Sequence, residues 1–483
     1  MTLKFNKGFG LGFSTAGFQH EMGLRGSEYE SDWYLWVHDP ENITAGIVSG
    51  DLPENGPGYW DLFSTDHSIA QSLGMDIARL GLEWARIFPR PTFGVKVRVE
   101  EEKGEIRAVE VQEPALKEMD SLANRGAVER YSQILRDWKS RGNKLIINLY
   151  HWPLPVWLHD PIRVRKLGPD RAPSGWVDPR SVVEFAKFAA YVNWKFGELA
   201  DMWSTMNEPN VVWGLGYLNV RSNFPPGYLD LKSMLTARSH IMEAHARAYD
   251  VLKETGKPIG VIYALSDVQP LDESSSKAAE DYDYFSHYLF LDSLSRGTGR
   301  EDLKGKLDWI GVNYYTRTIV SPGQKLAADL PAIRVVPGYG FACPPSSRSL
   351  DGRPTSEFGW EVYPEGLYNV ILKLKSRYSL PMIVTENGIA DSKDNWRSWY
   401  LVSHLHQIHR AISQGADVRG YLHWNLIDNY EWASGFRMKF GLVYVDLETK
   451  RRYLRPSALV FREIARNKEI PDSMEHLAGP PRL

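Results

Sequence analysis

Cysteine is nearly absent from the sequence, which contains one, Cys343, in 483 residues. A single cysteine can form neither an intramolecular disulfide nor a cysteine-based metal site, and this usage suits a reducing compartment. Long apolar runs are also missing, because no stretch reaches the roughly 18 uninterrupted apolar residues typical of a transmembrane helix. Lys4, Asn6 and Lys7 interrupt the apolar residues near the start, so no signal-peptide core can be drawn. We therefore expect a cytoplasmic protein with no membrane partner.

An excess of charge of one sign is lacking as well. The 57 Lys and Arg residues stand against 60 Asp and Glu residues, for a formal net charge of -3. No basic block resembles a nucleic-acid footprint, and the richest basic stretch, 163–171, lies among prolines and glycines typical of a solvated loop. Aromatic residues are abundant, with 17 Trp, 24 Tyr and 18 Phe. They indicate either a large core or faces on which sugar rings stack.

Eight short apolar runs, each followed by a helical pattern, recur along the chain. Such alternation is typical of a parallel sheet covered by helices, and eight units suggest closure into a barrel. We therefore predict the α/β class and a (β/α)8 TIM barrel. The expected strands lie at Phe9–Ala16, Asp76–Glu83, Lys144–His151, Met202–Glu208, Pro258–Ser266, Leu307–Tyr315, Met382–Glu386 and Arg419–Asn425.

Two of the intervening helices have clear signals. Asp178-Pro179 is expected to open one, as N-cap and first-turn proline, and Pro364 to open another whose apolar residues recur at i, i+3, i+4 and i+7 from Leu367. No repeat or linker divides the chain, so residues 1–483 are expected to form a single domain. The stretches 23–61, 89–123, 153–173 and 319–361 are expected to be long loops, most of them decorating the C-terminal face of the barrel, where barrel active sites lie.

Two glutamates stand at the ends of predicted strands. Glu208 ends the fourth strand and is followed by Pro209, and Glu386 ends the seventh. These strand ends lie across the mouth of a closed barrel, so the two carboxyl groups can converge. Glycoside hydrolysis needs such a pair, and a separation of roughly 5–5.5 Å leads to retention of anomeric configuration.

Six separated motifs, in order, make the chain resemble glycoside hydrolase family 1, the retaining β-glycosidases, and more narrowly its archaeal β-glucosidase/β-galactosidase branch. The resemblance covers nearly the whole chain. It rests on the segments 16–19 (AGFQ), 150–153 (YHWP), 205–210 (TMNEPN), 313–316 (NYYT), 385–388 (TENG) and 423–432 (HWNLIDNYEW), with 49–60 similar to the archaeal members in particular.

The resemblance implies an exo-acting β-glycosidase, cleaving glucosides and galactosides through a covalent glycosyl-enzyme, with transglycosylation as a side activity. It assigns Glu208 as acid/base and Glu386 as nucleophile. Arg79 is expected to stabilise the ionised Glu386, and Tyr315 to hydrogen-bond the same carboxylate. The implied partner is a small β-glycoside or oligosaccharide, with no cofactor and no metal.

The resemblance also implies the sugar-binding residues. Gln19, His151, Asn207, Trp424 and Glu431 would contact the hydroxyls of the nonreducing sugar, with Asn207 holding the 2-hydroxyl. Trp432 would form the stacking floor. Three further residues complete the predicted binding set, namely Asn313 and the walls Trp152 and Trp360, the last nearer the leaving group.

Alternatives within the same fold are a β-mannosidase or a 6-phospho-β-glycosidase. An acidic residue at 431 would repel phosphate, and Phe440 follows Lys439 where phosphate-binding relatives carry tyrosine. Glu rather than Gln at 208 argues against the plant thioglucosidases. Archaeal relatives are commonly homotetramers and thermophilic, so a homo-oligomer is expected by resemblance, with residues 480–483 as a candidate interface segment.

Other classes of protein fit less well. The glycines of 8–12 lack the third glycine of a dinucleotide-binding turn. The only histidine cluster, His404, His406 and His409, falls in a helix-like stretch expected to be a solvated surface rather than a metal site. A carbohydrate-binding protein without catalysis is the remaining alternative, and the presence of both glutamates argues against it.

Overall fold

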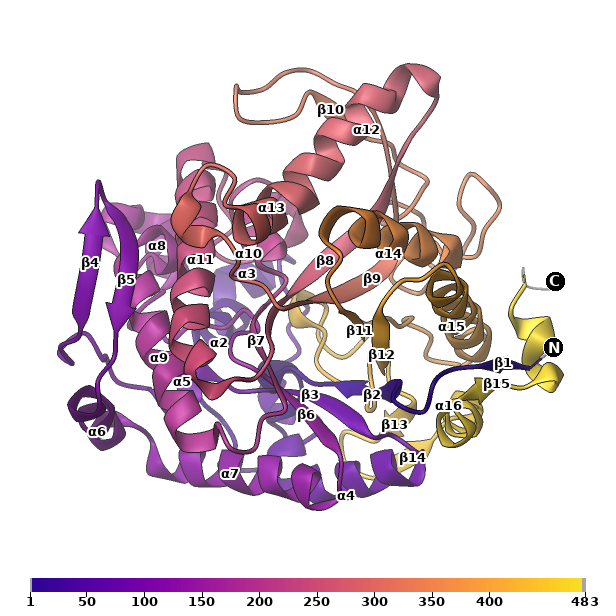
Figure 1. Cartoon of the computed structure of the whole chain (residues 1–483), viewed down its shortest axis with the longest axis horizontal. Helices are drawn as coiled ribbons and strands as arrows, with labels where there is room; N and C mark the ends of the chain where they lie inside the picture. Colours follow the sequence, from indigo (N-terminus) through magenta and orange to yellow (C-terminus); the bar gives the residue numbers. More distant parts are fainter. Residues whose placement is uncertain (1, 480–483) are drawn as a thin grey trace.

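The computed structural model describes residues 2–479, and its centre is a closed ring of eight parallel strands. Neighbours around the ring follow chain order, and β8 pairs with β9 to close it. The (β/α)8 barrel predicted from the sequence is confirmed (Figure 1). The ring strands are β2 Gly10–Ser14, β3 Ile77–Gly81, β6 Lys144–Asn148, β7 Met202–Asn207, β8 Ile259–Pro270, β9 Trp309–Pro322, β11 Met382–Glu386 and β12 Val418–His423.

Helices surround the ring and further short strands lie outside it (Figure 1). The α-helices are α1 Gly17–His20, α2 Asp32–His38, α3 Pro40–Thr44, α4 Tyr59–Ser72, α5 Trp84–Ile87, α6 Glu113–Leu122, α7 Arg125–Ser140, α8 Pro161–Leu167, α9 Arg180–Phe196, α10 Pro209–Tyr217, α11 Leu231–Leu252, α12 Ser276–Asp283, α13 Leu289–Arg296, α14 Pro364–Tyr378, α15 Arg397–Ser413 and α16 Pro456–Asn467. The outer strands are β1 Leu3–Lys4, β4 Arg98–Glu102, β5 Glu105–Glu110, β10 Ile333–Val335, β13 Val443–Val445, β14 Arg452–Leu454 and β15 Glu469–Ile470.

The interior of the ring is packed rather than hollow at its N-terminal end. Side chains from six of the ring strands meet there in one apolar cluster, which consists of Ile77, Ile146, Ile262, Trp309, Ile383 and Leu422. Burying such a layer stabilises the closed ring and leaves the strand C-termini as the open mouth. Among the described residues, no helix is long and apolar enough to cross a membrane.

The predicted helix stripes are largely confirmed. Leu367 and the three apolar residues after it in the stripe of α14 are buried. At α9, however, the N-cap is Pro179 and the helix begins at Arg180, so the prediction of Asp178 as N-cap was wrong by one residue. The Asp178 carboxylate accepts a hydrogen bond from the Arg180 backbone N at 2.9 Å, and the ring of Pro179 fixes its own φ at a helical value of -61°.

The four long stretches are not structureless, and that prediction was wrong. Residues 23–61 contain α2 and α3, residues 89–123 contain the β4–β5 hairpin and α6, and residues 319–361 contain β10. The basic stretch 163–171 lies partly in α8, where Asp160 caps the helix and Pro161 occupies its first turn. These elements are too short for periodicity to reveal, and tertiary packing stabilises them.

One member of the histidine cluster in α15 departs from expectation, whereas His406 and His409 are partly exposed. His404 is fully buried, and its Nδ1 lies 2.7 Å from the Tyr400 carbonyl. Burial lowers the pKa of His404 to about 4, so the ring is neutral and faces the core rather than solvent.

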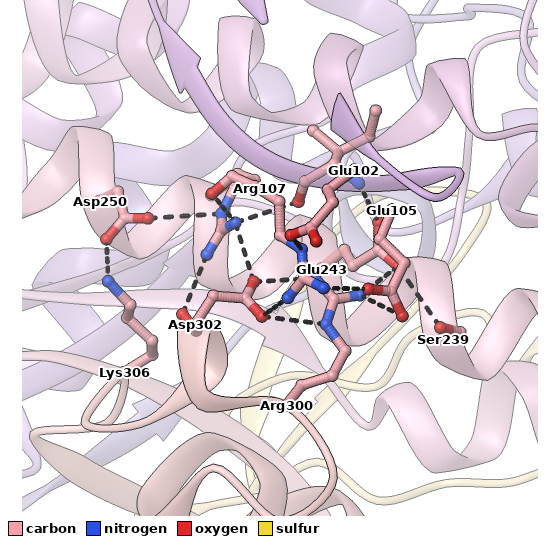
Figure 2. A network of polar contacts seen from close by, with 11 residues as sticks. Glu102, Glu105, Arg107, Ser239, Glu243, Asp250, Arg300, Asp302 and Lys306 are labelled. Carbon is pink, nitrogen blue, oxygen red and sulfur yellow. Dashed lines mark hydrogen bonds and ion pairs between the residues drawn. The ribbon is translucent and has the colours of Figure 1, made fainter. Parts of the chain in front are cut away.

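An ion-pair network joins the β4–β5 hairpin to α11 and to the segment before β9 (Figure 2). Asp302 accepts hydrogen bonds from Arg300 Nη2 at 2.8 Å and from Arg247 Nη1 at 3.1 Å, and also pairs with Arg107. Burial alone would raise the pKa of Asp302, but these arginines outweigh it and lower the pKa from 3.8 to about 2.

We expect Asp302→Asn to lower the free energy of unfolding by about 1–3 kcal/mol at pH 7, because three guanidinium groups lose one shared charged acceptor. Since folding depresses this pKa, the contribution is present above the ordinary value of 3.8 and disappears as the pH falls through about 2. Calorimetric melting temperatures at several pH values measure it. Glu301→Gln, which breaks an exposed pair with Lys304, is the matched control and should change stability by less than about 0.5 kcal/mol.

Candidate active site

The two candidate catalytic glutamates lie at the mouth of the barrel. Glu208 directly follows β7 and caps α10 with φ 49° and ψ 56°, a left-handed conformation that non-glycine residues rarely adopt. Pro209 begins the helix after it, and the Glu208 N donates to the Ile262 carbonyl at 2.8 Å. Glu386 is the last residue of β11. The two residues are 7% and 4% exposed, so both carboxyl groups are held in a largely desolvated mouth.

Glu386 is held by two donors. Arg79 of β3 donates from Nη2 to its Oε1 at 2.6 Å, and the Tyr315 hydroxyl donates to its Oε2 at 2.7 Å. Arg79 is itself fully buried. A guanidinium and a hydroxyl thus each bind one oxygen of the Glu386 carboxyl group and fix its orientation.

Glu208 has the opposite environment. Burial and then the charge of Glu386 raise its pKa to about 8, against weaker opposing effects of an Asn313 hydrogen bond and of Arg79. The Asn313 Nδ2 donates to Glu208 Oε1 at 2.8 Å. The carboxyl is therefore protonated at neutral pH and can act as a general acid.

One polar network connects the two glutamates across four strand ends. Arg79 Nη1 donates to Asn207 Oδ1 at 2.6 Å, and Asn313 Nδ2 reaches the same oxygen at 3.1 Å. Thr385, which precedes the nucleophile, donates to Asn313 Oδ1 at 2.7 Å. Asn207 also contacts His151 Nε2 through its Nδ2 at 3.1 Å. Arg79 thus contacts two predicted site residues that are 128 and 307 positions away in the sequence, Asn207 and Glu386.

The predicted sugar-binding residues line the same mouth. Gln19 Nε2 donates to Glu431 Oε2 at 3.2 Å and to the Tyr430 carbonyl at 3.0 Å. Among the described residues, Gln19 Oε1 and His151 Nδ1 are buried without a hydrogen-bond partner. Buried polar atoms are rarely left unpaired, so these two atoms are suited to bind ligand hydroxyls.

Burial and nearby charges also determine the protonation of Glu431 and His151. Burial and then the charges of Glu386 and Glu208 raise the pKa of Glu431 to about 8. Burial lowers the pKa of His151 well below its ordinary value, with Arg79 acting in the same direction. At neutral pH both side chains are therefore uncharged. Glu431 can donate to and accept from sugar hydroxyls, and His151, whose Nε2 accepts from Asn207, can donate from Nδ1.

The tryptophans form one aromatic cluster and one separate wall. Trp432 contacts Trp152 at a ring separation of 4.5 Å and stacks on Phe18 at 5.6 Å. Trp33 lies 4.6 Å from Trp432. Trp360 lies instead against Tyr315 at 5.2 Å. Trp424 lies on the nucleophile side, with the Arg79 guanidinium 5.8 Å from its ring.

Sequence reasoning missed Phe18 and Trp33, which support the predicted stacking floor. Phe18 stands beside Gln19 in the 16–19 motif, so its position was a signal, whereas Trp33 lies in a stretch that looked irregular. A glycine is required at 388, two residues after Glu386, because a Cβ there would come within 1.8 Å of the Trp424 carbonyl oxygen. Among the described residues, no group of three or more His, Cys, Asp or Glu side chains is arranged to hold a metal ion.

Comparison with known proteins agrees with this geometry. The family "Glycosyl hydrolase family 1" matches residues 118–302 and 298–470. The β-galactosidase of Saccharolobus solfataricus is 55% identical, covering 99% of this chain and 98% of its own, and that of Sulfolobus acidocaldarius is 50% identical with the same coverage. The crystal structure of the β-glycosidase from the hyperthermophile Thermosphaera aggregans is 53% identical with a TM-score of 0.95, covering 99% of this chain and 100% of that one.

The resemblance drawn from the sequence motifs is therefore confirmed, and so is the enzymatic reading over a carbohydrate-binding protein without catalysis. The roles of individual residues rest on the geometry above and stay predictions. The chain belongs to glycosyl hydrolase family 1 and is a retaining β-glycosidase built on a (β/α)8 barrel.

Proposed function

We propose that this enzyme removes single β-D-glucosyl and β-D-galactosyl units from the nonreducing end of its substrates by double displacement, with Glu386 as nucleophile and Glu208 as acid/base. The observation that carries the proposal is the pair of buried carboxyls in one barrel mouth with opposite environments. Arg79 and Tyr315 hold Glu386, while burial and the charge of Glu386 raise the pKa of Glu208 to about 8.

In the first step a Glu386 oxygen attacks the anomeric carbon while the bond to the leaving oxygen breaks, and Glu208 gives that oxygen its proton. The products are a covalent glycosyl-enzyme and a free alcohol. Ester formation removes the charge of Glu386, which is a cause of the raised pKa of Glu208. That pKa therefore falls, and Glu208 takes a proton from the water that attacks in the second step.

The remaining predicted residues have roles that fit their positions. Asn207, fixed by Arg79, would hold the 2-hydroxyl, a contact that strengthens in the transition state. Gln19, His151, Trp424 and Glu431 would bind the other hydroxyls, with Trp432 beneath the ring. Because the glycosyl-enzyme can also react with a sugar hydroxyl, transglycosylation at high substrate concentration is part of the proposal.

Relatives support the glucoside and galactoside preference. The chain is similar to proteins named β-galactosidase from two archaea and is 57% identical to a solved β-glucosidase from Pyrococcus furiosus, with a TM-score of 0.93 and 98% of each chain covered. Glu431 does not favour a 6-phosphorylated sugar, because its carboxyl supplies no positive charge and becomes negatively charged as the pH rises through about 8. The β-mannosidase alternative differs only in hydrogen-bond geometry around one hydroxyl.

The test is a panel of nitrophenyl β-glycosides with the first-formed anomer followed by NMR. We expect β-glucose and β-galactose as first products, with EDTA having no effect. An α-anomer as the first product would overturn the double displacement, and turnover of mannosides alone would overturn the substrate assignment.

We further propose that residues 1–483 form one domain, that the protein is cytoplasmic, and that it assembles as a homotetramer. A β-glucosidase mutant "derived from a hyperthermophilic tetrameric structure" is 55% identical to this chain. Four large apolar side chains are 42–47% exposed on β13, β14 and α16, and such a patch suits a subunit interface. They are Tyr444, Tyr453, Leu454 and Leu459. Residues 480–483, the predicted interface segment, lie outside the described residues.

Light scattering after gel filtration measures the assembly. A tetramer would have four times the chain mass of 55.1 kDa, and we expect Leu454→Asp to reduce this mass because it places a charge in the apolar patch. A monomer in the unsubstituted protein would contradict the tetramer.

A further inference from the structure

Trp360 occupies the end of a segment with little secondary structure of its own. Between β10 and α14 the chain forms only turns and isolated bridges, such as Thr355 with Glu361. Yet the Trp360 ring lies 5.2 Å from that of Tyr315, whose hydroxyl donates to Glu386. A contact other than the aromatic contacts of Trp360 must therefore hold this segment against β9.

The residue after Trp360 supplies that contact. Glu361 is fully buried as a side chain, and it accepts both arms of the Arg317 guanidinium, Nε to Oε2 and Nη2 to Oε1, each at 2.8 Å. Such a two-point pair fixes orientation as well as distance. Arg317 belongs to β9, two residues beyond Tyr315, so one strand carries both the partner of the nucleophile and the anchor of the Trp360 segment.

Further polar contacts join both Glu361 and Arg317 to neighbouring parts of the chain. Glu361 Oε2 accepts from the Gly340 N at 2.9 Å, which fixes the start of the segment as well as its end. Arg317 Nη1 donates to Gln269 of β8 at 3.2 Å, and the guanidinium lies 4.3 Å from the Tyr363 ring. Arg317 also pairs with Asp351 at the turn of the segment.

The other aromatic contacts of the Trp360 ring do not join it to a strand of the barrel. Phe358 stacks on it at 4.4 Å and Phe341 lies edge-on at 5.4 Å, but both belong to the same segment. They shape the segment internally and would move together with it. Phe440 contacts it from another segment at 6.1 Å, without a polar bond.

We infer that Arg317 and Glu361 are positioning residues for the leaving-group subsite, because their buried pair locks Trp360 against Tyr315. This rests on the proposed function, in which Trp360 is the wall nearer the leaving group. The leaving group is present in the first step and has departed before the second. Loosening the wall should therefore slow formation of the glycosyl-enzyme from substrates with aromatic aglycones and leave its hydrolysis unchanged.

The experiment compares Glu361→Gln, Trp360→Ala and the double variant on two glucosides that share the sugar, one with a nitrophenyl and one with a methyl aglycone. We expect Glu361→Gln to lower kcat/KM for the nitrophenyl glucoside about 10-fold to 100-fold, as misplacement of a binding group does, and for the methyl glucoside less than about 3-fold. With dinitrophenyl glucoside, for which breakdown of the glycosyl-enzyme limits turnover, kcat should stay at the wild-type value. The double variant should be no worse than Trp360→Ala alone.

Arg452→Lys is the matched control, because Arg452 forms an equally buried two-point pair with Asp66, at 2.8 and 2.9 Å, between β14 and α4. It should lower the melting temperature without changing the ratio of the two kcat/KM values. Equal losses on both aglycones, or additive losses in the double variant, would overturn the inference. Failure of the wild-type protein to cleave either glucoside would instead contradict the proposed function.

Discussion

Replacing Glu386 by alanine is expected to lower kcat by at least about four orders of magnitude, because no covalent intermediate can form. Added azide or formate should restore turnover by occupying the space of the missing carboxylate. With azide the product should be the α-glycosyl azide, since one displacement inverts the anomeric centre. NMR of the product mixture identifies it.

The interpretation of this variant needs a folding control. Removing the carboxylate leaves Arg79, which is fully buried, without its charged partner, and an unpaired buried charge is destabilising. Glu386→Gln keeps an oxygen for Arg79 and should fold more stably while remaining inactive. If either variant, folded by circular dichroism, kept more than a small fraction of the wild-type rate without added anion, Glu386 would not be the nucleophile.

Replacing Glu208 by alanine is expected to have an effect that depends on the leaving group. For alkyl glucosides the alcohol must be protonated as it leaves, so kcat/KM should fall by about 10²–10⁴-fold. For dinitrophenyl glucoside, whose leaving group needs little protonation, kcat/KM should change by less than about 10-fold. Deglycosylation should be slow because no base activates water, and azide should accelerate it with a β-glycosyl azide as product.

The same residue determines the alkaline side of the pH profile. Burial and the charge of Glu386 raise the pKa of Glu208 to about 8, so the acid form is present below that pH and is lost as the pH rises through it. Wild-type kcat/KM on alkyl glucosides should fall accordingly, and Glu208→Ala should lack this alkaline limb. An unchanged limb in the variant would assign the titration to another group, for which Glu431, with its pKa raised to about 8, is the first candidate.

The sequence predicted the barrel because its strands are buried on both sides and therefore read as short apolar runs. Each of the eight predicted runs overlaps a ring strand, but β8 and β9 extend beyond their predicted ends at Ser266 and Tyr315 to Pro270 and Pro322, and β12 begins one residue earlier than predicted, at Val418. The extensions of β8 and β9 pair with each other and with β10 outside the ring. Their pairing depends on a neighbouring strand, which local patterning does not encode.

The sequence-based predictions that were wrong concern the segments between the strands. The β4–β5 hairpin looked irregular because its first strand is exposed throughout. Ile106 and Val109 of the second strand are buried in the core, and charged network partners also hold the hairpin in place (Figure 2). The histidines of α15 were predicted to be solvated because they are polar. His404 is instead buried, and its Nδ1 contacts the Tyr400 carbonyl.

The sequence by itself determined the strand count and the family and singled out the two glutamates as candidates, because these depend on residue types at local spacings. Only the tertiary structure supplied a physical reason for the roles that the resemblance assigns to them, since burial and the nearby charge of Glu386 raise the pKa of Glu208 while Arg79 and Tyr315 hold Glu386. It also brought together Arg317 and Glu361, which lie 44 positions apart in the sequence, as a buried pair next to Trp360. Such through-space electrostatic contacts leave no periodic signal in a single chain.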